Sequence, residues 1–427
     1  MDFSPSSEQA AARDLAASIF ADLSTPERLA GLGGATDSEL WKALTDAGLV
    51  GAVEEAGLLG LVLMLEEQGR TTAQVPFAVH CVYGLLAVAS HGTEEQRRRL
   101  LPGLRDGTTV ATGAFPGRIG IEVSGGAEPG RAGVFPGRAD VELSSSDEPE
   151  RARLTGSVPW VPWLRDATYV LVAVRERAAS AAHSLWMVRA ADARCEPVEL
   201  TAPWSAGRLV LDGTAAERIG GPEAYEEVRA VARTALAGLQ AGVCAGSLAR
   251  AVAHTNQREQ FGRPLAAKQG VQLRAAEAHM DVEAVRVTAY EAAWRYDEGL
   301  GCRSHALTAA WWASEGGRRV VHTGQHLHGG TGADLDHPVH RHFLWGRQLD
   351  GYLGGGPEVL EELGGLLAAP EAPLQAPPDA PLQAPPDAPP QAPPDAPLET
   401  SPEAPLETSP EAPLGTSSEA LPEGERG

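Results

Sequence analysis

Near the middle of this 427-residue chain stands the stretch Arg258-Glu259-Gln260-Phe261-Gly262-Arg263-Pro264-Leu265-Ala266-Ala267-Lys268-Gln269. Its pattern predicts the end of one amphipathic helix, a Gly/Pro turn and the start of a second helix, because Gly and Pro interrupt regular structure. A guanidinium binds phosphate oxygens through two parallel hydrogen bonds. A diphosphate could therefore be held by Arg258 and Gln260, and a purine could stack on the Phe261 ring. The residue types alone, however, favour an ordinary turn between two helices.

A second glycine-rich stretch follows about 70 residues later. It is His322-Thr323-Gly324-Gln325-His326-Leu327-His328-Gly329-Gly330-Thr331-Gly332. Because glycine has no Cβ, a backbone can lie there against a flat or phosphorylated ligand, and a nearby helix N-terminus would favour its negative charge. A Gly-Gly-x-Gly motif alone is weak evidence for a ligand site. Its position about 70 residues after the first stretch makes the evidence stronger.

The same region is rich in histidine. Six of the twelve histidines fall between residues 322 and 342. His322 and His326 have the i, i+4 spacing of two metal ligands on one helix face. No carboxylate or Cys completes a recognisable ligand spacing, so no metal site is predicted.

Charge and composition exclude several classes of protein. The formal net charge is −22, and residues 371–427 hold eleven acids against one Arg. Nucleic acids and anionic membranes attract basic surfaces, so neither is an expected partner. The four cysteines are far apart, which favours reduced, buried thiols in the cytosol. We find neither a targeting segment nor a run approaching the roughly 20 apolar residues of a membrane helix.

The chain divides into regions of different hydrophobic pattern. Residues 1–107 have apolar residues at helical spacing, residues 108–220 contain short β-like runs typical of a compact antiparallel sheet, and residues 221–367 return to long amphipathic helices. The fold class is therefore α+β, mainly α. The expected helices and strands are Ser7–Ala21, Glu39–Ala47, Leu58–Gln68, Phe77–Ala89, a helix from Thr93 to Pro102-Gly103, the strands Thr109–Phe115, Ala139–Leu143, Ala167–Val174, Ser184–Arg189 and Arg208–Leu211, then the helices Glu223–Asn256, Gln269–Tyr296, Ser304–Thr323 and Glu358–Leu367.

Two segments differ from these regions. Gly113–Asp147 is so rich in Gly, Pro and Ser that we expect a loose excursion from the sheet. Residues 368–427 form an imperfect octapeptide repeat, Ala-Pro-Leu-Gln-Ala-Pro-Pro-Asp, with too little apolar surface to offset the entropy of ordering. We expect a disordered tail that leans to polyproline II. A Pro-rich docking ligand is the alternative, less favoured because flanking Arg residues are missing.

The two glycine-bearing stretches resemble signatures of the acyl-CoA dehydrogenases. The first is similar to Arg-x-x-Phe-Gly-x-Pro-Leu/Ile-x-x-x-Gln, which in that family touches the FAD of a neighbouring subunit. The second is similar to Gln-x-x-Gly-Gly-x-Gly, with His326 in place of Gln. The resemblance covers residues 1–367 and implies an N-terminal helical domain, a middle β domain and a C-terminal four-helix bundle that drives oligomerisation. Its implied cofactor contacts are Arg258, Gln260, Phe261, His326, Gly329, Gly330, Gly332 and Trp160.

The resemblance also implies a reaction, oxidation of the Cα–Cβ bond of an acyl-CoA or acyl-carrier thioester. A carboxylate removes the α-proton, hydrogen bonds polarise the thioester, and hydride passes to the flavin. This chain departs from the pattern at the base. Gly354 and Ala232 occupy the two places where family members carry the catalytic Glu, and Glu226 and Glu227 are better explained as a solvated helix start.

The flavin-ring side departs as well. The family's Thr-Glu-Pro strand is replaced by Ala114-Phe115-Pro116-Gly117-Arg118, and its Trp-x-Thr/Ser by Trp160-Val161-Pro162. Pro162 has neither a hydroxyl nor an N–H, and Trp160 is as well explained by a core position as by a flavin contact. Residues that would serve a neighbour's FAD are mostly kept, while those of the chain's own flavin-ring site are mostly lost.

Three hypotheses follow. The first is the subunit without the base in a heteromeric acyl-CoA dehydrogenase, resembling those of bacterial sterol breakdown, with a Glu-bearing paralogous partner, a cytoplasmic location and an electron-transfer flavoprotein as acceptor. The second is a self-sufficient homo-oligomeric flavoenzyme with a relocated base such as Asp350, or with oxygen chemistry. The third is a non-catalytic acyl-CoA-binding or scaffold protein. The acyl group is not predicted.

Overall fold

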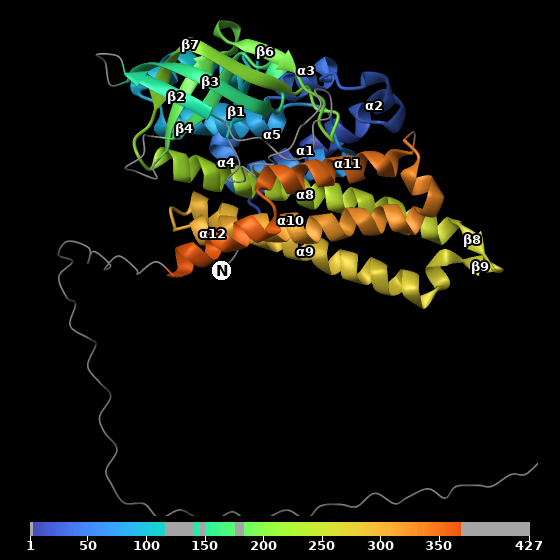
Figure 1. Cartoon of the computed structure of the whole chain (residues 1–427). Coiled ribbons are helices and arrows are strands. Elements are labelled where there is room, and N and C mark those ends of the chain that lie inside the picture. The colour runs from blue at the N-terminus through green and yellow to red at the C-terminus, as the bar shows by residue number, and fades with distance from the viewer. Residues whose placement is uncertain (1–2, 116–139, 146–149, 176–182, 336, 369–427) are drawn as a thin grey trace, which may run out of the picture. The chain divides into compact units, whose positions relative to one another are not determined.

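Helices, then a sheet, then helices again follow one another in the structure, a computed structural model that describes residues 3–115, 140–145, 150–175, 183–335 and 337–368 (Figure 1). All of these residues belong to one unit, Met1–Pro370, and Glu371–Gly427 form a second unit. The α+β class, mainly α, is confirmed. The predicted tail and most of the predicted excursion Gly113–Asp147 lie outside the described residues.

Most of the N-terminal helices begin and end within two or three residues of the prediction, but α4 begins at Leu49 rather than Leu58, and α2 was not predicted. Thr93 caps its helix through a capping box, since its side chain accepts from the Gln96 amide and the Gln96 side chain accepts from the Thr93 amide. The predicted end at Pro102 is wrong, because Pro102 lies in the last turn and its carbonyl still accepts from Asp106. The helices are α1 (Ser7–Leu23), α2 (Pro26–Leu32), α3 (Ser38–Asp46), α4 (Leu49–Thr71), α5 (Phe77–Val79), a π-helical turn (His80–Leu86), α6 (Ala87–His91) and α7 (Glu94–Arg105).

The middle region forms a seven-stranded sheet with the order β1-β4-β5-β7-β3-β2, in which β6 pairs with β7. Strands β1 and β4 run parallel, so the antiparallel prediction is wrong at that edge. The chain between them forms β2 and β3 at the opposite edge, and a parallel pair requires such a crossover. The strands are β1 (Ala111–Ala114), β2 (Asp140–Ser145), β3 (Arg151–Val161), β4 (Tyr169–Arg175), β5 (His183–Arg189), β6 (Arg194–Pro197) and β7 (Gly207–Ile219).

Two of these strands escaped the sequence analysis. β3 carries Arg, Gly and Pro among its residues and is exposed at alternate positions in its first half. β6 has only four residues, of which three are exposed. Neither therefore shows the continuous apolar run by which the inner strands β4 and β5 were recognised.

The C-terminal helices pack around one long helix. α8 contacts both α9 and α10, these two contact each other, and α11 packs on α8 and α10 (Figure 1). α11 was not predicted, because His, Arg and Gly interrupt a stripe in which Val339, Trp345 and Leu349 are buried. The helices are α8 (Ala224–Gln257), α9 (Gln269–Asp297), α10 (Arg303–His328), α11 (Pro338–Leu353) and α12 (Gly356–Ala368).

α8 is more apolar than the sequence analysis recognised. By length and composition it could cross a membrane, as could α3 and α4 together if the bent pair were one span. However, 78% of its apolar window is buried inside the molecule. Burial by neighbouring helices accounts for this apolar surface, as in the core helix of a globular domain.

Helices α4 and α8 approach each other at the backbone. Gly238, Gly242 and Gly246 lie on successive turns of α8 and face α4. A Cβ on Gly242 would lie far inside van der Waals contact with the carbonyl of Glu66, and one on Gly246 would do the same with that of Arg70. Only glycine at these positions permits this crossing.

A buried carboxylate joins α4 to α9 beside this crossing. Glu66 is 4% exposed. It accepts from Arg286 Nη2 at 2.7 Å, from Arg70 Nη2 at 3.0 Å and from the Tyr290 hydroxyl at 2.8 Å. A buried charge is tolerated when it is paired and hydrogen-bonded, so these contacts fix how α9 lies against α4.

The glycine crossing predicts opposite effects of two similar substitutions. Gly242→Ala should lower the free energy of unfolding by about 1–3 kcal/mol or more, because the added methyl group forces the two backbones apart. Gly364→Ala is the matched control, since Gly364 lies within α12 with no atom near its Cβ position. It should raise stability by about 0.5–1 kcal/mol through helix propensity. Denaturant titration measures both, and a neutral Gly242→Ala variant would contradict the crossing.

Candidate functional site

The first predicted stretch forms a small hairpin where α8 ends. Arg258 follows α8, and Glu259–Gln260 (β8) pairs with Arg263–Pro264 (β9). Phe261 lies at the tip with a φ of +58° and its side chain 90% exposed. Such a backbone conformation is uncommon for a bulky residue and is found at ligand sites more often than elsewhere.

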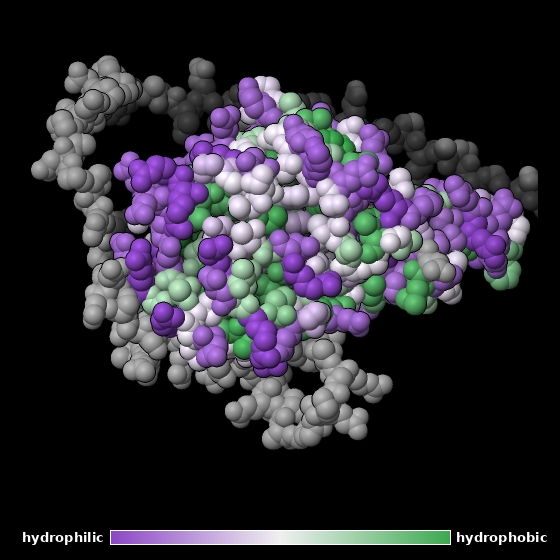
Figure 2. Space-filling view, turned by 90° about the horizontal axis from the view of Figure 1, so that it is seen from above, coloured by the Kyte–Doolittle hydropathy of each residue, from purple (hydrophilic) through white to green (hydrophobic). Residues whose placement is uncertain are grey.

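Exposed groups surround this ring. The Lys268 ammonium lies 4.5 Å from the centre of the Phe261 ring. No partner for the Arg258 guanidinium occurs among the described residues. Figure 2 shows the end of the molecule with the hairpin projecting from the rest, hydrophilic with a hydrophobic patch near its tip. The hairpin thus offers free cations and an aromatic face to a ligand outside this chain.

The second predicted stretch lies at the same end. His326 is in the last turn of α10 rather than in a loop, and Gly329–Ala333 form a 3-10 turn. The imidazoles of His328 on α10 and His254 on α8 stack at 4.6 Å, which brings the two stretches together.

The glycines of this turn differ in what they require. Gly329 has a φ of +64°, and a Cβ on Gly332 would collide with the carbonyl of Gln325. Both positions therefore need glycine for the turn itself. Gly330 has no atom within 4 Å of its Cβ position, so open space adjoins it.

Trp160 lies elsewhere. It comes from β3 and contacts Tyr352 near the C-terminal end of α11, with 5.3 Å between ring centres. His337, which caps the other end of α11, contacts His328 at 4.9 Å. The 16 residues of α11 span about 24 Å, so the predicted cofactor residues occupy two separate places on one chain.

An aromatic cluster, defined as Tyr83, Phe115, Trp160, Tyr225 and Tyr352, fills the junction of the sheet with the bundle. The Tyr352 hydroxyl donates to that of Tyr83 at 3.0 Å, and the Phe115 ring contacts the rings of Tyr83 at 4.8 Å and Tyr225 at 5.8 Å. Burial raises the pKa of Tyr83 to about 12, so it stays protonated at neutral pH. Sequence reasoning found only Trp160, because single aromatic residues on five separate segments leave no local pattern.

Neither of the two places expected for a catalytic base carries a carboxylate. At both places a substitution by Glu would be unfavourable. Gly354 ends α11 with a φ of +107°, which strains any residue with a Cβ. Ala232 is 5% exposed, so a Glu there would bury a charge. A carboxylate that the sequence analysis missed, Glu362 on α12, is bound by Arg233 Nη2 at 2.7 Å and also by Arg229. These ion pairs give Glu362 a structural role between α12 and α8.

Asp350 was the alternative candidate for a relocated base. One of its oxygens accepts from the Ser314 hydroxyl on α10, and the other pairs with Arg347 Nη1 at 2.6 Å. Asp350 therefore joins α11 to α10. Both of its oxygens therefore have a partner within this chain.

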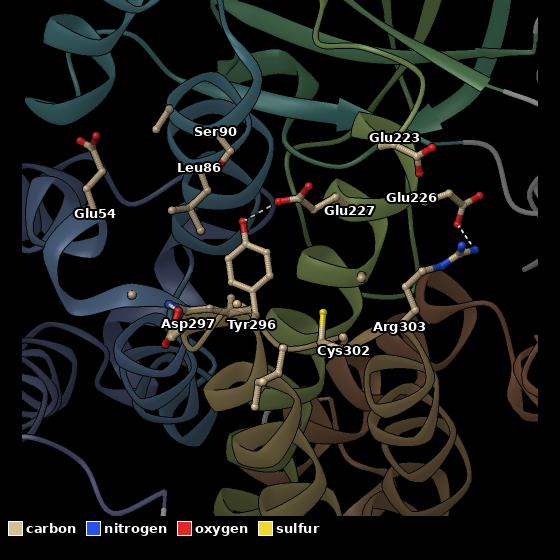
Figure 3. Close-up of a pocket in the computed structure, with 17 residues that line it drawn as sticks. Glu54, Leu86, Ser90, Glu223, Glu226, Glu227, Tyr296, Asp297, Cys302 and Arg303 are labelled. Carbon is tan, nitrogen blue, oxygen red and sulfur yellow. Dashed lines mark hydrogen bonds and ion pairs between the residues drawn. The ribbon is translucent and has the colours of Figure 1, made fainter. Parts of the chain in front are cut away.

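A cleft of about 690 Å³ lies between the start of α8 and the end of α9 (Figure 3). Three of its carboxylates are engaged, since Glu226 accepts from Arg303 at 2.8 Å, Glu227 from the Tyr296 hydroxyl at 3.2 Å, and Asp297 from the amides of Leu58 and Leu59. Glu226 and Glu227 lie in the first turn of α8 and are partly exposed, as the predicted helix start implies, and both also have partners in this cleft. Five carboxylates against Arg303 disfavour an anionic ligand, so we do not assign the cleft to a thioester of CoA.

The remaining sequence predictions concern cysteine and metal. All four cysteines are free thiols, and Cys81 and Cys244 are buried, but Cys195 on β6 is exposed and corrects the prediction that all are buried. Across the described part of the chain, no group of three or more His, Cys, Asp or Glu side chains is arranged to hold a metal ion. Residues Pro116–Arg118 of the predicted flavin strand and Asp336 lie outside the described residues.

An apolar stripe runs along the outer face of α9. Leu273, Met280 and Val287 are 56%, 70% and 49% exposed and are spaced seven residues apart. This spacing places them on one side of a helix, as in helices that pack against another helix. We expect such an exposed apolar stripe to take part in association between chains.

The fold and its two glycine-bearing stretches define a class, the acyl-CoA dehydrogenase-type flavoproteins. Residues 6–108 match the acyl-CoA dehydrogenase N-terminal domain and residues 221–363 the C-terminal domain of that family. Acyl-CoA dehydrogenase FadE27 of Mycobacterium tuberculosis is 30% identical over 356 residues, covering 79% of this chain and 90% of that protein. The chain belongs to the acyl-CoA dehydrogenase family.

Solved structures agree with this assignment. A structure described as a variant of the Tcur3481-Tcur3483 steroid ACAD has 38% identity and a TM-score of 0.75, covering 84% of this chain and 98% of its own. The ChsE4-ChsE5 complex from Mycobacterium tuberculosis has 29% identity and a TM-score of 0.77, covering 87% and 100%. Acyl-CoA dehydrogenase FadE28 of the same organism is 26% identical over 381 residues, covering 85% of this chain and 98% of that protein.

The apolar stripe on α9 predicts that a single charge weakens association. Met280→Glu should raise the dissociation constant of the oligomer by about tenfold or more, because the carboxylate would be buried at an apolar contact. Leu15→Glu is the control, since Leu15 is also exposed but lies on α1. Light scattering over a dilution series measures both. An unchanged mass for Met280→Glu at every concentration would place the interface elsewhere.

Proposed function

We propose that this protein is the subunit without the base in a heteromeric, FAD-dependent acyl-CoA dehydrogenase that oxidises the Cα–Cβ bond of an acyl thioester. One observation carries the proposal. The groups expected to bind the cofactor gather at one end of the bundle, while the two places expected for a base hold Gly354 and Ala232 at the other. A second subunit would supply the Glu, and this chain would complete that subunit's flavin site.

The residues at the hairpin end fit FAD in their chemistry. Arg258 and Lys268 offer positive charge to a diphosphate, and the exposed ring of Phe261 offers a face for stacking. Gln260, His326, Gly329, Gly330 and Gly332 would line the adenosine side. When bound, FAD supplies the acceptor for the substrate hydride. The part of this chain is to hold and orient that cofactor.

The aromatic cluster supports the division of labour. Trp160 and Tyr352 are in contact, with 5.3 Å between their centres. A flavin ring inserted between two rings needs about twice the stacking distance, so this arrangement would have to open before Trp160 could cover a flavin of the same chain. The residues around Trp160 are therefore less suited to binding a flavin than the residues at the hairpin end.

The relatives suggest the substrate and the partner. One similar structure is described as a steroid acyl-CoA dehydrogenase and another as a complex of two differently named proteins. We propose by similarity that the thioester carries a steroid side chain, that the partner is a Glu-bearing paralogue, and that the complex works in the cytoplasm. An electron-transfer flavoprotein would accept the electrons.

The test is to purify the chain alone and after co-expression with candidate Glu-bearing paralogues, and to compare flavin absorbance, mass and thioester oxidation. Turnover and flavin are expected only in the complex. Tight FAD and turnover by the chain alone would favour the self-sufficient flavoenzyme. A stable complex without flavin would favour the non-catalytic scaffold.

Arg258→Ala should weaken FAD retention by the complex by about 1.5–3 kcal/mol, the contribution of a hydrogen bond to a charged group. Thermal stability of the chain alone should not change, because Arg258 is exposed and makes no side-chain contact with another described residue. Arg274→Ala on α9 removes an equally exposed charge and serves as the control. Fluorescence of released FAD after dilution measures the effect, and equal loss in both variants would refute the role of Arg258.

Asp350→Asn distinguishes the two catalytic hypotheses. If the partner supplies the base, turnover by the complex should fall less than about tenfold, while stability falls by about 1–3 kcal/mol as the contacts to Ser314 and Arg347 are lost. A base removed from the reaction instead costs a factor of about 10² or more. Steady-state rates on complexes of confirmed mass decide between them.

A further inference from the structure

A cleft of about 390 Å³ lies where α7 meets one face of the sheet. Four arginines line it, Arg99 from α7, Arg151 and Arg153 from β3, and Arg189 from β5. We call it the arginine cleft. It shares no lining residue with the acidic cleft at the start of α8, and none of its residues belongs to the aromatic cluster or to the hairpin end of the bundle. Its chemistry is therefore separate from that of the proposed flavin site.

Strand pairing places two of these arginines on either side of a small residue. Arg153 lies opposite Ala215 on β7. Arg189 lies opposite Tyr169 on β4, and continuing the register of β5 on β7 brings it beside Ala215 as well. Paired residues point to the same face of a sheet, so Arg153 and Arg189 stand about 10 Å apart, two strand spacings, with only a methyl group between them. Both guanidinium groups can therefore reach one anion above Ala215.

The floor of the arginine cleft is apolar. Leu100 of α7 and Met187 of β5 line it and are 4% and 5% exposed. Tyr169 also lines it and packs against the hydrophobic core. An apolar floor with a few charged groups around it is typical of pockets for small organic ligands. A ligand with a flat carbon body and a negative charge would satisfy both parts of the cleft.

Positive charge is in excess in this cleft. Its described lining holds four arginines against two carboxylates, Asp192 and Glu217. Arg99 forms an ion pair with Glu217, so one arginine is compensated within the chain. Arg151 also has a partner. The other two arginines face a single lining carboxylate, Asp192, although the chain as a whole has a net charge of −22.

These other two arginines, Arg153 and Arg189, retain donors for a ligand. Nη1 of Arg153 donates to the Gly213 carbonyl at 2.7 Å, and no carboxylate contacts this guanidinium in the described part of the chain. Arg189 is exposed and has neither an ion pair nor a hydrogen bond with another described residue. A guanidinium presents five N–H donors in a planar fork that matches two oxygens of one anion. The pair therefore offers more donors than the described part of the chain satisfies.

We propose that the arginine cleft binds a phosphate monoester carried on a flat ring, with Arg153 and Arg189 on the phosphate and the ring over Tyr169 and Met187. A phosphate monoester carries about two negative charges at neutral pH, which two guanidinium groups match better than they match the single charge of a carboxylate. A nucleoside monophosphate and a simpler aryl phosphate share this chemistry. The site goes beyond the proposed function and does not depend on it.

The first experiment measures binding of phenyl phosphate to the full chain by calorimetry at about pH 8, where the monoester is fully charged. Arg189→Gln should weaken binding by about tenfold or more, because a hydrogen bond between charged groups is lost, and Arg189→Lys should weaken it by less. Arg175→Gln is the control, since it removes an exposed charge from β4 outside the cleft and should change nothing. Equal affinity of wild type and Arg189→Gln, with both folded by circular dichroism, would overturn the proposal.

A second variant, Ala215→Leu, tests the space between the arginines rather than their charge. It keeps all four arginines but fills the gap between Arg153 and Arg189, and the fold should tolerate it because Ala215 is exposed. Binding of phenyl phosphate should again weaken by about tenfold or more, since the larger side chain occupies the place of the phosphate. Unchanged binding by a folded Ala215→Leu variant would overturn the proposed geometry.

Competition against phenyl phosphate distinguishes the source of the phosphate. Inorganic phosphate that binds as tightly as phenyl phosphate would indicate an adventitious ion only and overturn the proposal of an organic ligand. AMP that binds more tightly, and loses affinity in Arg189→Gln, supports a nucleotide. Weaker AMP with the same loss supports a simpler aryl phosphate. Binding that is lost in Arg258→Ala but retained in Arg189→Gln would assign the anion to the hairpin end and overturn the site in the arginine cleft.

Discussion

The backbone contact between α4 and α8 determines where everything else in the described unit can lie. Because Gly238, Gly242 and Gly246 expose the main chain of α8, α4 can lie against it at a distance that no larger residue would allow. The buried Glu66 then binds Arg286 of α9 from the same face of α4. One crossing therefore fixes three helices, and the sheet and α11 are positioned against them.

This arrangement makes α8 the axis of the functional surface. Its 34 residues span about 51 Å. Tyr225 at its start belongs to the aromatic cluster, and the ring of His254 near its end stacks on that of His328. The helix holds these two ends apart, so one chain presents its aromatic junction and the hairpin proposed to bind the cofactor at different places. The proposed active site shared between subunits would account for a chain that keeps one half of the family signature and lacks the other.

Charge reinforces the division. The cleft at the start of α8 is lined by five carboxylates, of which Glu226 is bound by Arg303 and Glu227 by Tyr296. Toward the far end Arg250 has no such partner among the described residues. Carboxylates thus line one end of α8, and a guanidinium without an ion pair in the described part of the chain lies near the other. This contrast favours a diphosphate at the hairpin and gives the acidic cleft no part in binding it.

The sequence by itself determined the order of helices, sheet and helices and the family, because helical spacing, short β runs and the Arg258–Gln269 stretch are local signals. It also showed that Gly354 and Ala232 leave the usual places for a base without a carboxylate. The parallel pairing of β1 with β4, the helix α11, the aromatic cluster and the stacking of His254 on His328 were decided only by the tertiary structure. Each depends on residues far apart in the chain, such as Tyr83 and Tyr352. Packing sets the proximity of such residues, so no local sequence pattern predicts it.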